Sequence, residues 1–187
     1  MTTKSDQIVA LLPMKAHSER VQGKNFRNFA GRPLFQWILD TLLSVQSISQ
    51  VVINTDARDI LSRHGLHEHG RIMIRDRREN LCGDHISMNR ILQDDLEAVP
   101  ADLYLMTHTT NPLLSAESIN TAISAYREGL QQGKDSLFSV NRYQTRFYRA
   151  DASAVNHDPN NLIRTQDLEP WFEENSNLYI FSKDSFI

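Results

Sequence analysis

Cysteine is nearly absent from this sequence, because Cys82 is the only one among 187 residues. The chain therefore forms no internal disulfide, which suits a reducing compartment. No apolar run approaches the roughly 18 residues of a membrane span, and the polar start MTTKSDQ lacks the apolar stretch of a secretory signal. These absences predict a cytoplasmic protein without a membrane partner.

An excess of positive charge is also missing. Lys and Arg total 20 against 23 for Asp and Glu, which gives a formal charge of -3. Such a chain has no electrostatic reason to bind nucleic acid independently of sequence. We therefore expect no nucleic-acid partner, and any basic site must be local.

The length and composition predict one domain. With 187 residues and 40% hydrophobic composition, the chain can bury one sizeable core but is short for two independent ones. We expect a single domain over residues 1–187. The segment 141–175 is richer in Arg, Asp, Asn and Gln, and it is interpreted as an excursion from the main body.

Buried strands alternate with helical segments along the chain. Apolar runs at 8–13, 51–55, 71–75, 103–107 and 136–140 read as strands buried on both faces, and 178–182 as one more strand. Helical spacing follows Pro33 and runs from Ser115, a possible N-cap, to Gly133. This alternation predicts an α/β fold with a mainly parallel sheet covered by helices. Ligands are then expected beyond the carboxyl ends of the strands, at the loops after residues 13, 55 and 107.

The loop after the first strand, MKAHSERVQGKN, is basic. Lys15, Arg20 and Lys24 surround Ser18 and Gly23. Backbone amides approach phosphate oxygens closely at a glycine, and the cations neutralise a pyrophosphate leaving group. The loop is not a Walker A motif, because Ser18 stands where that motif has its first glycine and Asn25 follows Lys24. A solvated basic turn remains the alternative.

Other polar residues leave two interpretations open. Asp56 follows a strand and is either an active-site carboxylate or the N-cap of a helix. Four histidines with no common zinc-ligand spacing are interpreted as solvated loop residues: His64, His67, His69 and His85. Cys82 lacks a recognised nucleophile motif, so a structural or nucleotide-adjacent role is favoured over catalysis.

Four sequence blocks together resemble a known enzyme family. PMKAHSERVQGKN resembles the signature loop of the acylneuraminate and KDO cytidylyltransferases, the CMP-sugar synthetases. INTDARDI, HTTNPLL and EENSNLYIF resemble three further blocks of that family in the same order, so the resemblance spans residues 8–183. It implies a Rossmann-like nucleotide-diphospho-sugar transferase fold, with helices on both faces of the sheet.

The resemblance also implies roles for individual residues. Catalytic roles in charge neutralisation fall on Lys15, Arg20 and Lys24. Nucleotide binding falls on Pro13, Ser18, Gly23, Asn25, Arg77 and Ser87. Binding of the acceptor sugar falls on His108, Thr110, Asn111, Arg164, Gln166 and Asn175. Metal ligands stay unassigned.

Several positions depart from the family pattern or keep an alternative. Lys15 replaces an Arg, so the charge survives but bidentate phosphate recognition is lost. Gln22 replaces a Pro and Ser176 a Gly, which alters loop stiffness and backbone approach. For Arg77 a position on a surface helix is the alternative, and for His108 the capping of a loop.

The implied reaction is the transfer of CMP from CTP to an acidic 2-keto-3-deoxy sugar of the sialic acid type, with release of pyrophosphate. Mg²⁺ is the implied cofactor, and a homodimer formed through residues 141–175 is the implied assembly. Alternatives are a nucleotidyltransferase for another base or sugar, and a catalytically inactive nucleotide-binding subunit. The family carries a late acidic magnesium motif beyond the last matching block, so we expect this chain to bind CTP but to turn over slowly.

Overall fold

The computed structural model describes residues 6–18 and 21–186, and it divides into two compact units. The first unit runs to Phe138 and includes the chain from Asn177 onward, and the second comprises Ser139–Ser176. Within the described ranges, no helix has both the length and the apolar character needed to cross a bilayer.

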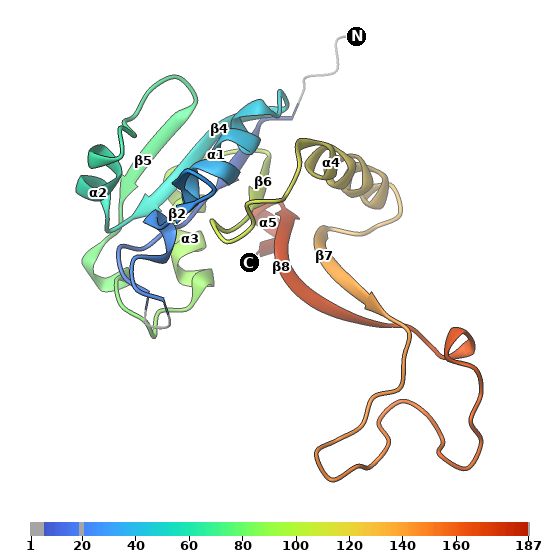
Figure 1. Cartoon of the computed structure of the whole chain (residues 1–187). Helices are drawn as coiled ribbons and strands as arrows, with labels where there is room; N and C mark the ends of the chain where they lie inside the picture. The colour runs from blue at the N-terminus through green and yellow to red at the C-terminus, as the bar shows by residue number, and fades with distance from the viewer. Residues whose placement is uncertain (1–5, 19–20, 187) are drawn as a thin grey trace. The chain divides into compact units, whose positions relative to one another are not determined.

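Six strands form one sheet in the order β5-β4-β1-β6-β8-β7 (Figure 1). Their bounds are β1 (Ile8–Leu11), β4 (Ile48–Thr55), β5 (Ile72–Asp76), β6 (Leu103–Met106), β7 (Ser136–Tyr143) and β8 (Trp171–Phe181). The pairs β1/β4, β1/β6 and β4/β5 are parallel, whereas β6/β8 is antiparallel. The predicted mainly parallel α/β sheet is therefore confirmed.

Two details of the strands differ from the sequence prediction. The last strand begins at Trp171, well before residue 178, and it pairs antiparallel to its neighbour, as Tyr104 opposite Phe181 shows. The strand that starts at Ser136 is not buried on both faces, because its side chains are half-buried or exposed. The strand lies at the edge of the sheet, where Leu137 packs against the apolar core, and its residues from Ser139 onward belong to the second unit, outside that core.

Five α-helices and three short 3₁₀ turns accompany the strands within the described residues. The helices are α1 (Leu34–Ser44), α2 (Arg58–Arg63), α3 (Met88–Ala98), α4 (Ala116–Leu130) and α5 (Lys183–Phe186), and the turns are η1 (Lys24–Phe26), η2 (Glu79–Leu81) and η3 (Thr165–Asp167). Ser115 caps α4 as predicted, because its side chain accepts a 3.1 Å hydrogen bond from the amide of Ser118. A small hairpin of β2 (Asn28–Phe29) and β3 (Arg32–Pro33) precedes α1.

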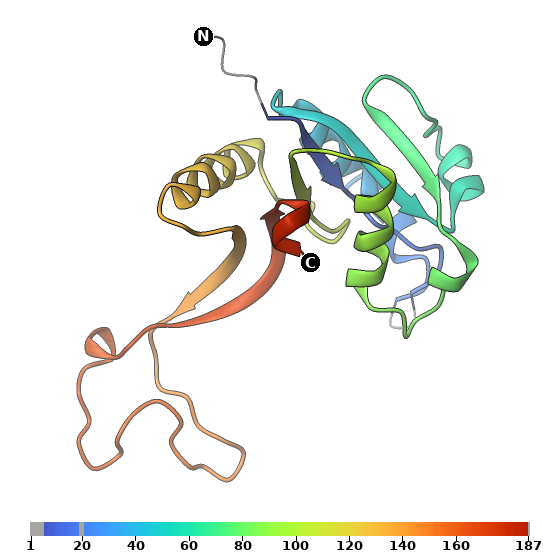
Figure 2. The ribbon, with the colours of Figure 1, turned by 180° about the vertical axis from the view of Figure 1, so that it is seen from behind.

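The central strands bury both faces. Alternate residues of β1 divide between two apolar clusters: Ile8 and Ala10 join the side chains of α1 and α4, whereas Val9 and Leu11 join those of α3. Figure 1 shows α1 in front of the sheet, and Figure 2, from behind, shows α3 in front. Helices cover both faces of the sheet. The ends of the strands and the loops beyond them therefore remain accessible in the first unit.

Candidate active site

A cavity of about 270 Å³ lies beyond the carboxyl ends of β1 and β6, within the first unit. It is lined by Pro13, Met14, Lys15, Ser18, Lys24, Asn25, Arg77, Gly83, Asp84, Ile86, Met88, Ile91, His108, Thr109 and Thr110. The lining thus combines cations and hydroxyls with an apolar wall. This is the usual composition of a site for a polar small molecule.

The loop after β1 is held by the neighbouring strand. The amide of Met14 donates to the carbonyl of Asn54 (3.1 Å), and the amide of Ala16 donates to Oδ1 of Asp56 (2.6 Å). Farther along, Gly23 adopts a left-handed conformation (φ 60°, ψ 27°) that glycine adopts without strain, and its carbonyl closes the 3₁₀ turn η1. Lys15, near the start of this loop, and Lys24, near its end, thereby line the same cavity.

Asp56 is not the N-cap of α2, so that alternative is wrong. Ala57 occupies the cap position, and its amide donates to the hydroxyl of Thr55 (3.0 Å). The carboxylate of Asp56 instead accepts from the backbone of the loop after β1. It therefore acts on the candidate site by holding that loop.

Asn25 joins two loops of the cavity. Its side chain is buried, its Nδ2 donates to the carbonyl of Lys15 (2.8 Å), and its Oδ1 accepts from the hydroxyl of Thr109 (2.5 Å). The amide thus links the loop after β1 to the loop after β6. It bonds to the protein through both of its polar atoms, which is a structural role in addition to the predicted nucleotide contact.

Two of the charged groups in the cavity form an ion pair, and a third affects the protonation of a histidine. Lys15 makes an ion pair with Asp84, and this lysine holds the pKa of the Asp84 carboxyl below its usual range. Burial, and then the positive charge of Lys24, lower the pKa of His108. His108 is therefore a neutral imidazole at pH 7, able both to donate and to accept a hydrogen bond.

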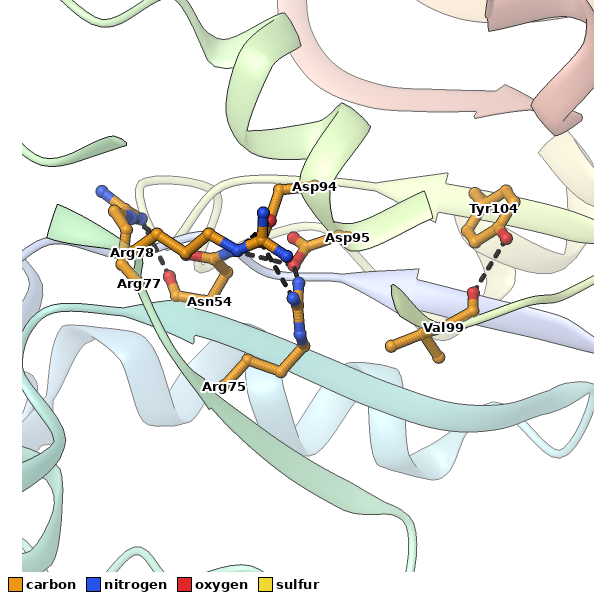
Figure 3. Close-up of polar contacts among 8 residues, drawn as sticks. All are labelled: Asn54, Arg75, Arg77, Arg78, Asp94, Asp95, Val99 and Tyr104. Atoms are coloured by element: carbon orange, nitrogen blue, oxygen red, sulfur yellow. Dashed lines mark hydrogen bonds and ion pairs between the residues drawn. The ribbon is translucent and has the colours of Figure 1, made fainter. Parts of the chain in front are cut away.

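Arg77 is held from behind by β4. It follows β5 directly and does not lie on a helix, so the surface-helix alternative is wrong. Its Nε donates to Oδ1 of Asn54 (2.9 Å), and its Nη2 donates to the backbone carbonyl of Asn54 (2.8 Å), as Figure 3 shows for this group of residues. Burial lowers the pKa of the Arg77 guanidinium. The side chain remains charged, because arginine is protonated at any physiological pH.

The predicted site residues divide by position. Eight of them line the cavity: Pro13, Lys15, Ser18, Lys24, Asn25, Arg77, His108 and Thr110. Gly23, Ser87 and Asn111 are not part of the lining: Gly23 caps η1, Ser87 is the exposed residue before α3, and Asn111 donates to Thr107 and to the carbonyl of Asn177. Arg20 lies outside the described residues.

Three predicted acceptor-binding residues belong to the second unit. Arg164 forms two hydrogen bonds to the carboxylate of Asp167 (2.7 and 3.0 Å), and Asn175 donates to Asn141 (3.0 Å). The carbonyl of Gln166 accepts from Gln144 (2.8 Å). Arg164 thus already binds one carboxylate through paired hydrogen bonds, and its role in binding the acceptor stays a prediction.

The sequence did not single out Asp84 or the apolar wall of the cavity. The wall consists of Met14, Ile86, Met88 and Ile91. Ile86 and Met88 precede or begin α3, which was not predicted. In this part of the chain, Cys82 and Ser87 were the residues considered for a position near the nucleotide. However, the role of Asp84 depends on its pairing with Lys15, which lies 69 positions away.

The mainly parallel sheet and the basic cavity at its strand ends are typical of α/β proteins that bind a ligand beyond the carboxyl ends of their strands. A sequence profile of the family described as Cytidylyltransferase matches residues 9–186. The chain belongs to this family. Its membership agrees with the position of the basic loop, which begins directly after β1.

Several curated proteins are similar to the chain. It is 23% identical over 147 residues to the pseudaminic acid cytidylyltransferase of Campylobacter jejuni, covering 76% of this chain and 61% of that protein. It is 25% identical over 184 residues to the N-acylneuraminate cytidylyltransferase of Oncorhynchus mykiss, covering 94% of this chain and 41% of that protein. The chain thus spans about three fifths or less of the length of these relatives.

Solved structures share the fold. A 4-diphosphocytidyl-2C-methyl-D-erythritol synthase from Anaerococcus prevotii matches with a TM-score of 0.66 at 16% identity, over 97% of this chain and 72% of that chain. A CMP:2-keto-3-deoxy-manno-octonic acid synthetase complexed with CTP matches with a TM-score of 0.64 at 16% identity, over 96% of this chain and 76% of that chain. These matches confirm the predicted nucleotidyltransferase fold class.

Proposed function

We propose that this protein is a cytidylyltransferase that transfers CMP from CTP to an acidic 2-keto-3-deoxy sugar of the sialic acid type and releases pyrophosphate. The observation that carries the proposal is the cavity where Lys15 and Lys24 meet Arg77 at the strand ends. Family membership supports the nucleotide. Relatives named for pseudaminic, legionaminic and N-acylneuraminic acids support the class of acceptor.

The proposed chemistry is a direct displacement. The acceptor hydroxyl gives its proton to solvent, its oxygen forms a bond to the α phosphorus, and the bond from that phosphorus to pyrophosphate breaks, so that pyrophosphate leaves with its electron pair. No protein nucleophile is required, so the protein's contribution is positioning and charge neutralisation. Lys15 and Lys24 supply this neutralisation in the proposal, and Arg20, outside the described residues, is proposed to add to it.

The remaining lining is assigned by its chemistry. Ser18 and the backbone of the loop after β1 suit phosphate oxygens, and Arg77 suits another polar group of the nucleotide. His108 and Thr110, after β6, suit the hydroxyls of a sugar. A neutral His108 both donates and accepts, which is what a hydroxyl requires of its partner.

Magnesium is proposed as the cofactor, held mainly by the phosphates. Mg²⁺ is commonly bound through one or two carboxylates together with substrate phosphates. Asp84 is a carboxylate that lines the cavity, and no group of three or more His, Cys, Asp or Glu is placed to hold a metal within the described ranges. The residues fit such an ion if Lys15 turns from Asp84 to the phosphates. When bound, the ion neutralises charge on the phosphate and on the leaving group.

The test combines nucleotide choice with one substitution. We expect wild-type protein to bind CTP and to release pyrophosphate slowly from it, but not from UTP, GTP or ATP, when an N-acetylneuraminate-like or KDO-like acceptor and Mg²⁺ are present. Lys24→Ala should weaken CTP binding by roughly ten- to hundredfold, because charged hydrogen bonds contribute about 1.5 to 3 kcal/mol. Calorimetry measures the affinity, and a coupled phosphate assay measures turnover.

The control is Lys134→Ala, which removes one positive charge at an exposed position that does not line the cavity. Its CTP affinity should equal that of the wild type. An unchanged affinity in Lys24→Ala would remove Lys24 from the site. CTP binding without turnover by any acceptor would favour the nucleotide-binding subunit, and no CTP binding at all would end the proposal.

A further inference from the structure

Five charged residues and one amide form a polar network behind the cavity. Asn54 lies near the end of β4, Asp94 and Asp95 lie on α3, and three arginines come from β5 and the residues that follow it: Arg75, Arg77 and Arg78. Figure 3 shows the three guanidinium groups gathered around the two carboxylates and Asn54. Of these residues, Arg77 is the one that lines the cavity.

The orientation of the Asn54 amide is fixed by Asp95. Nδ2 of Asn54 donates to Oδ1 of Asp95 (2.8 Å), which leaves Oδ1 of Asn54 to accept from Nε of Arg77 (2.9 Å). Both Asn54 and Asp95 are fully buried, with 0% of their surface exposed. An amide flipped by half a turn would present its NH₂ group to the Arg77 donor, which is repulsive. Asp95 therefore selects the amide orientation that accepts from Arg77.

Arg77 is held along one edge of its guanidinium. Besides the bond from Nε, its Nη2 donates to the backbone carbonyl of Asn54 (2.8 Å) and more weakly to that of Met14 (3.4 Å). These partners lie on β4 and on the start of the loop after β1. A guanidinium held in this way is already oriented before a ligand arrives, so binding need not order it.

The buried carboxylate of Asp95 is unfavourable for the fold taken alone. Burial raises its pKa, although Asn54 and Arg75 oppose that change, and within the described structure its Oδ2 has no hydrogen-bond partner. A buried acid with an unsatisfied oxygen costs free energy that an apolar residue would not. The ion pair with Arg75 offsets part of this cost, and the contact with Asn54 gives Asp95 a role beyond packing.

We propose that Asp95 and Asn54 are positioning residues that fix the Arg77 guanidinium for contact with the nucleotide in the cavity. The inference rests on the proposed function, because it requires that CTP occupies this site. Asp95 acts only through Asn54, and Asn54 only through Arg77. Neither residue touches the ligand, since neither lines the cavity.

Two substitutions at Asp95 separate this role from packing. Asp95→Ala removes the acceptor that orients the Asn54 amide, and we expect the Kd for CTP to rise at least about tenfold as the Arg77 contact weakens. Asp95→Asn keeps an oxygen that accepts the hydrogen bond from the Asn54 amide. Its NH₂ group replaces Oδ2, the atom that has no hydrogen-bond partner within the described structure. We therefore expect Asp95→Asn to bind CTP within about twofold of wild type.

A matched control removes another bond of the same network. Arg78 pairs with Asp94 (2.9 Å) and has 65% of its side chain exposed. Arg78→Gln should leave the Kd for CTP within about twofold of wild type, because within the described structure no hydrogen bond or ion pair joins the Arg78 side chain to Asn54 or Arg77. Urea unfolding of every variant shows whether a loss of affinity follows a loss of stability.

A double-mutant cycle tests the order of action. If Asp95 acts through Arg77, then Asp95→Ala has no further effect on CTP affinity in an Arg77→Met background. Additive losses would overturn the inference, because they would show that Asp95 supports the site by another route. If Asp95→Ala does not fold, Asn54→Leu, which is close in size, takes its place in the same cycle.

The failure of this inference is distinguishable from the failure of the proposed function. Wild-type protein that binds no CTP overturns both. Wild-type protein that binds CTP, with Asp95→Ala binding it equally well, overturns only the positioning role.

Discussion

His108 links the charge of the cavity to the stability of the fold. Its imidazole is half-buried after β6, and burial and Lys24 together lower its pKa from the ordinary value of 6.5. Unfolding releases the side chain from both effects. The unfolded protein therefore binds a proton near pH 6.5, whereas the folded protein binds it only at a lower pH. Between these two pH values the unfolded state holds more protons, so stability falls as the pH falls.

His108→Gln removes this titration. We expect the free energy of unfolding of the wild type to decrease more steeply than that of the variant as the pH falls below about 6.5, by at most about 1.4 kcal/mol per pH unit. Urea titrations at steps between about pH 7 and about pH 5 measure both slopes. Equal slopes would show that His108 is as well solvated in the folded protein as in the unfolded one.

Asn25 and Asp56 show which residue roles a sequence cannot reveal. Asn25 was predicted to bind the nucleotide, and Asp56 was left as either an active-site carboxylate or a helix N-cap. However, the partner of Asn25 is Thr109, 84 positions later, and the partner of Asp56 is the amide of Ala16, 40 positions earlier. A local pattern such as a helix cap is defined within a few residues. Bonds between loops at different strand ends depend on the complete sheet.

At the scale of elements, the carbonyl end of α1 is capped by the side chain of an arginine that lies directly before β5. The last carbonyls of a helix have no partner within it, and α1 has no basic residue in its last turn. Arg71, directly before β5, donates to the carbonyls of Val45 (3.1 Å) and Ile48 (2.7 Å), and also to that of Leu43. Its positive charge lies at the negative end of the helix dipole, which is favourable. One side chain therefore fastens α1, β4 and β5 to each other.

Arg71→Met removes these three bonds while it keeps much of the aliphatic length. We expect a loss of about 2 to 4 kcal/mol in the free energy of unfolding, measured by urea titration. Arg127→Met is the control, because Arg127 makes only an exposed pair with Asp6 at 3.6 Å. That control should change stability by no more than about 0.5 kcal/mol. Similar losses in both variants would contradict the capping role of Arg71.

The sequence pattern did not predict the helix α3, and the reason is physical. Its sequence MNRILQDDLEA places three carboxylates inside a helix, two of them buried, and its N-cap residue Ser87 makes no side-chain capping bond. Asp94 and Asp95 are buried only because Arg75 and Arg78 come from β5 and the chain beyond it to pair with them. The strongly apolar strands and the capped helix α4 were predictable from local pattern. A helix stabilised by ion pairs with distant residues was not.

At the scale of the whole molecule, the second unit has little core of its own. Of the residues in Ser139–Ser176, all of which the structure describes, Leu168 is the buried apolar one. Large apolar side chains are exposed instead, including Leu162 (62%) and Phe172 (60%). Large exposed apolar side chains that gather on one segment are typical of contacts between proteins. Together with the family resemblance of this segment, it supports the predicted homodimer.

We expect light scattering to give a particle of twice the 21.5 kDa mass of the chain at micromolar concentration. The double variant Leu162→Asp and Phe172→Asp places two charges on the apolar surface of the second unit, and burial of those charges in an interface is costly. Its mass should fall to that of one chain. Leu113→Asp is the control, because Leu113 is equally apolar and 88% exposed but belongs to the first unit, so its mass should stay that of a dimer. A wild-type monomer would refute the homodimer, and a dimer that survives the double variant would place the interface elsewhere on the chain.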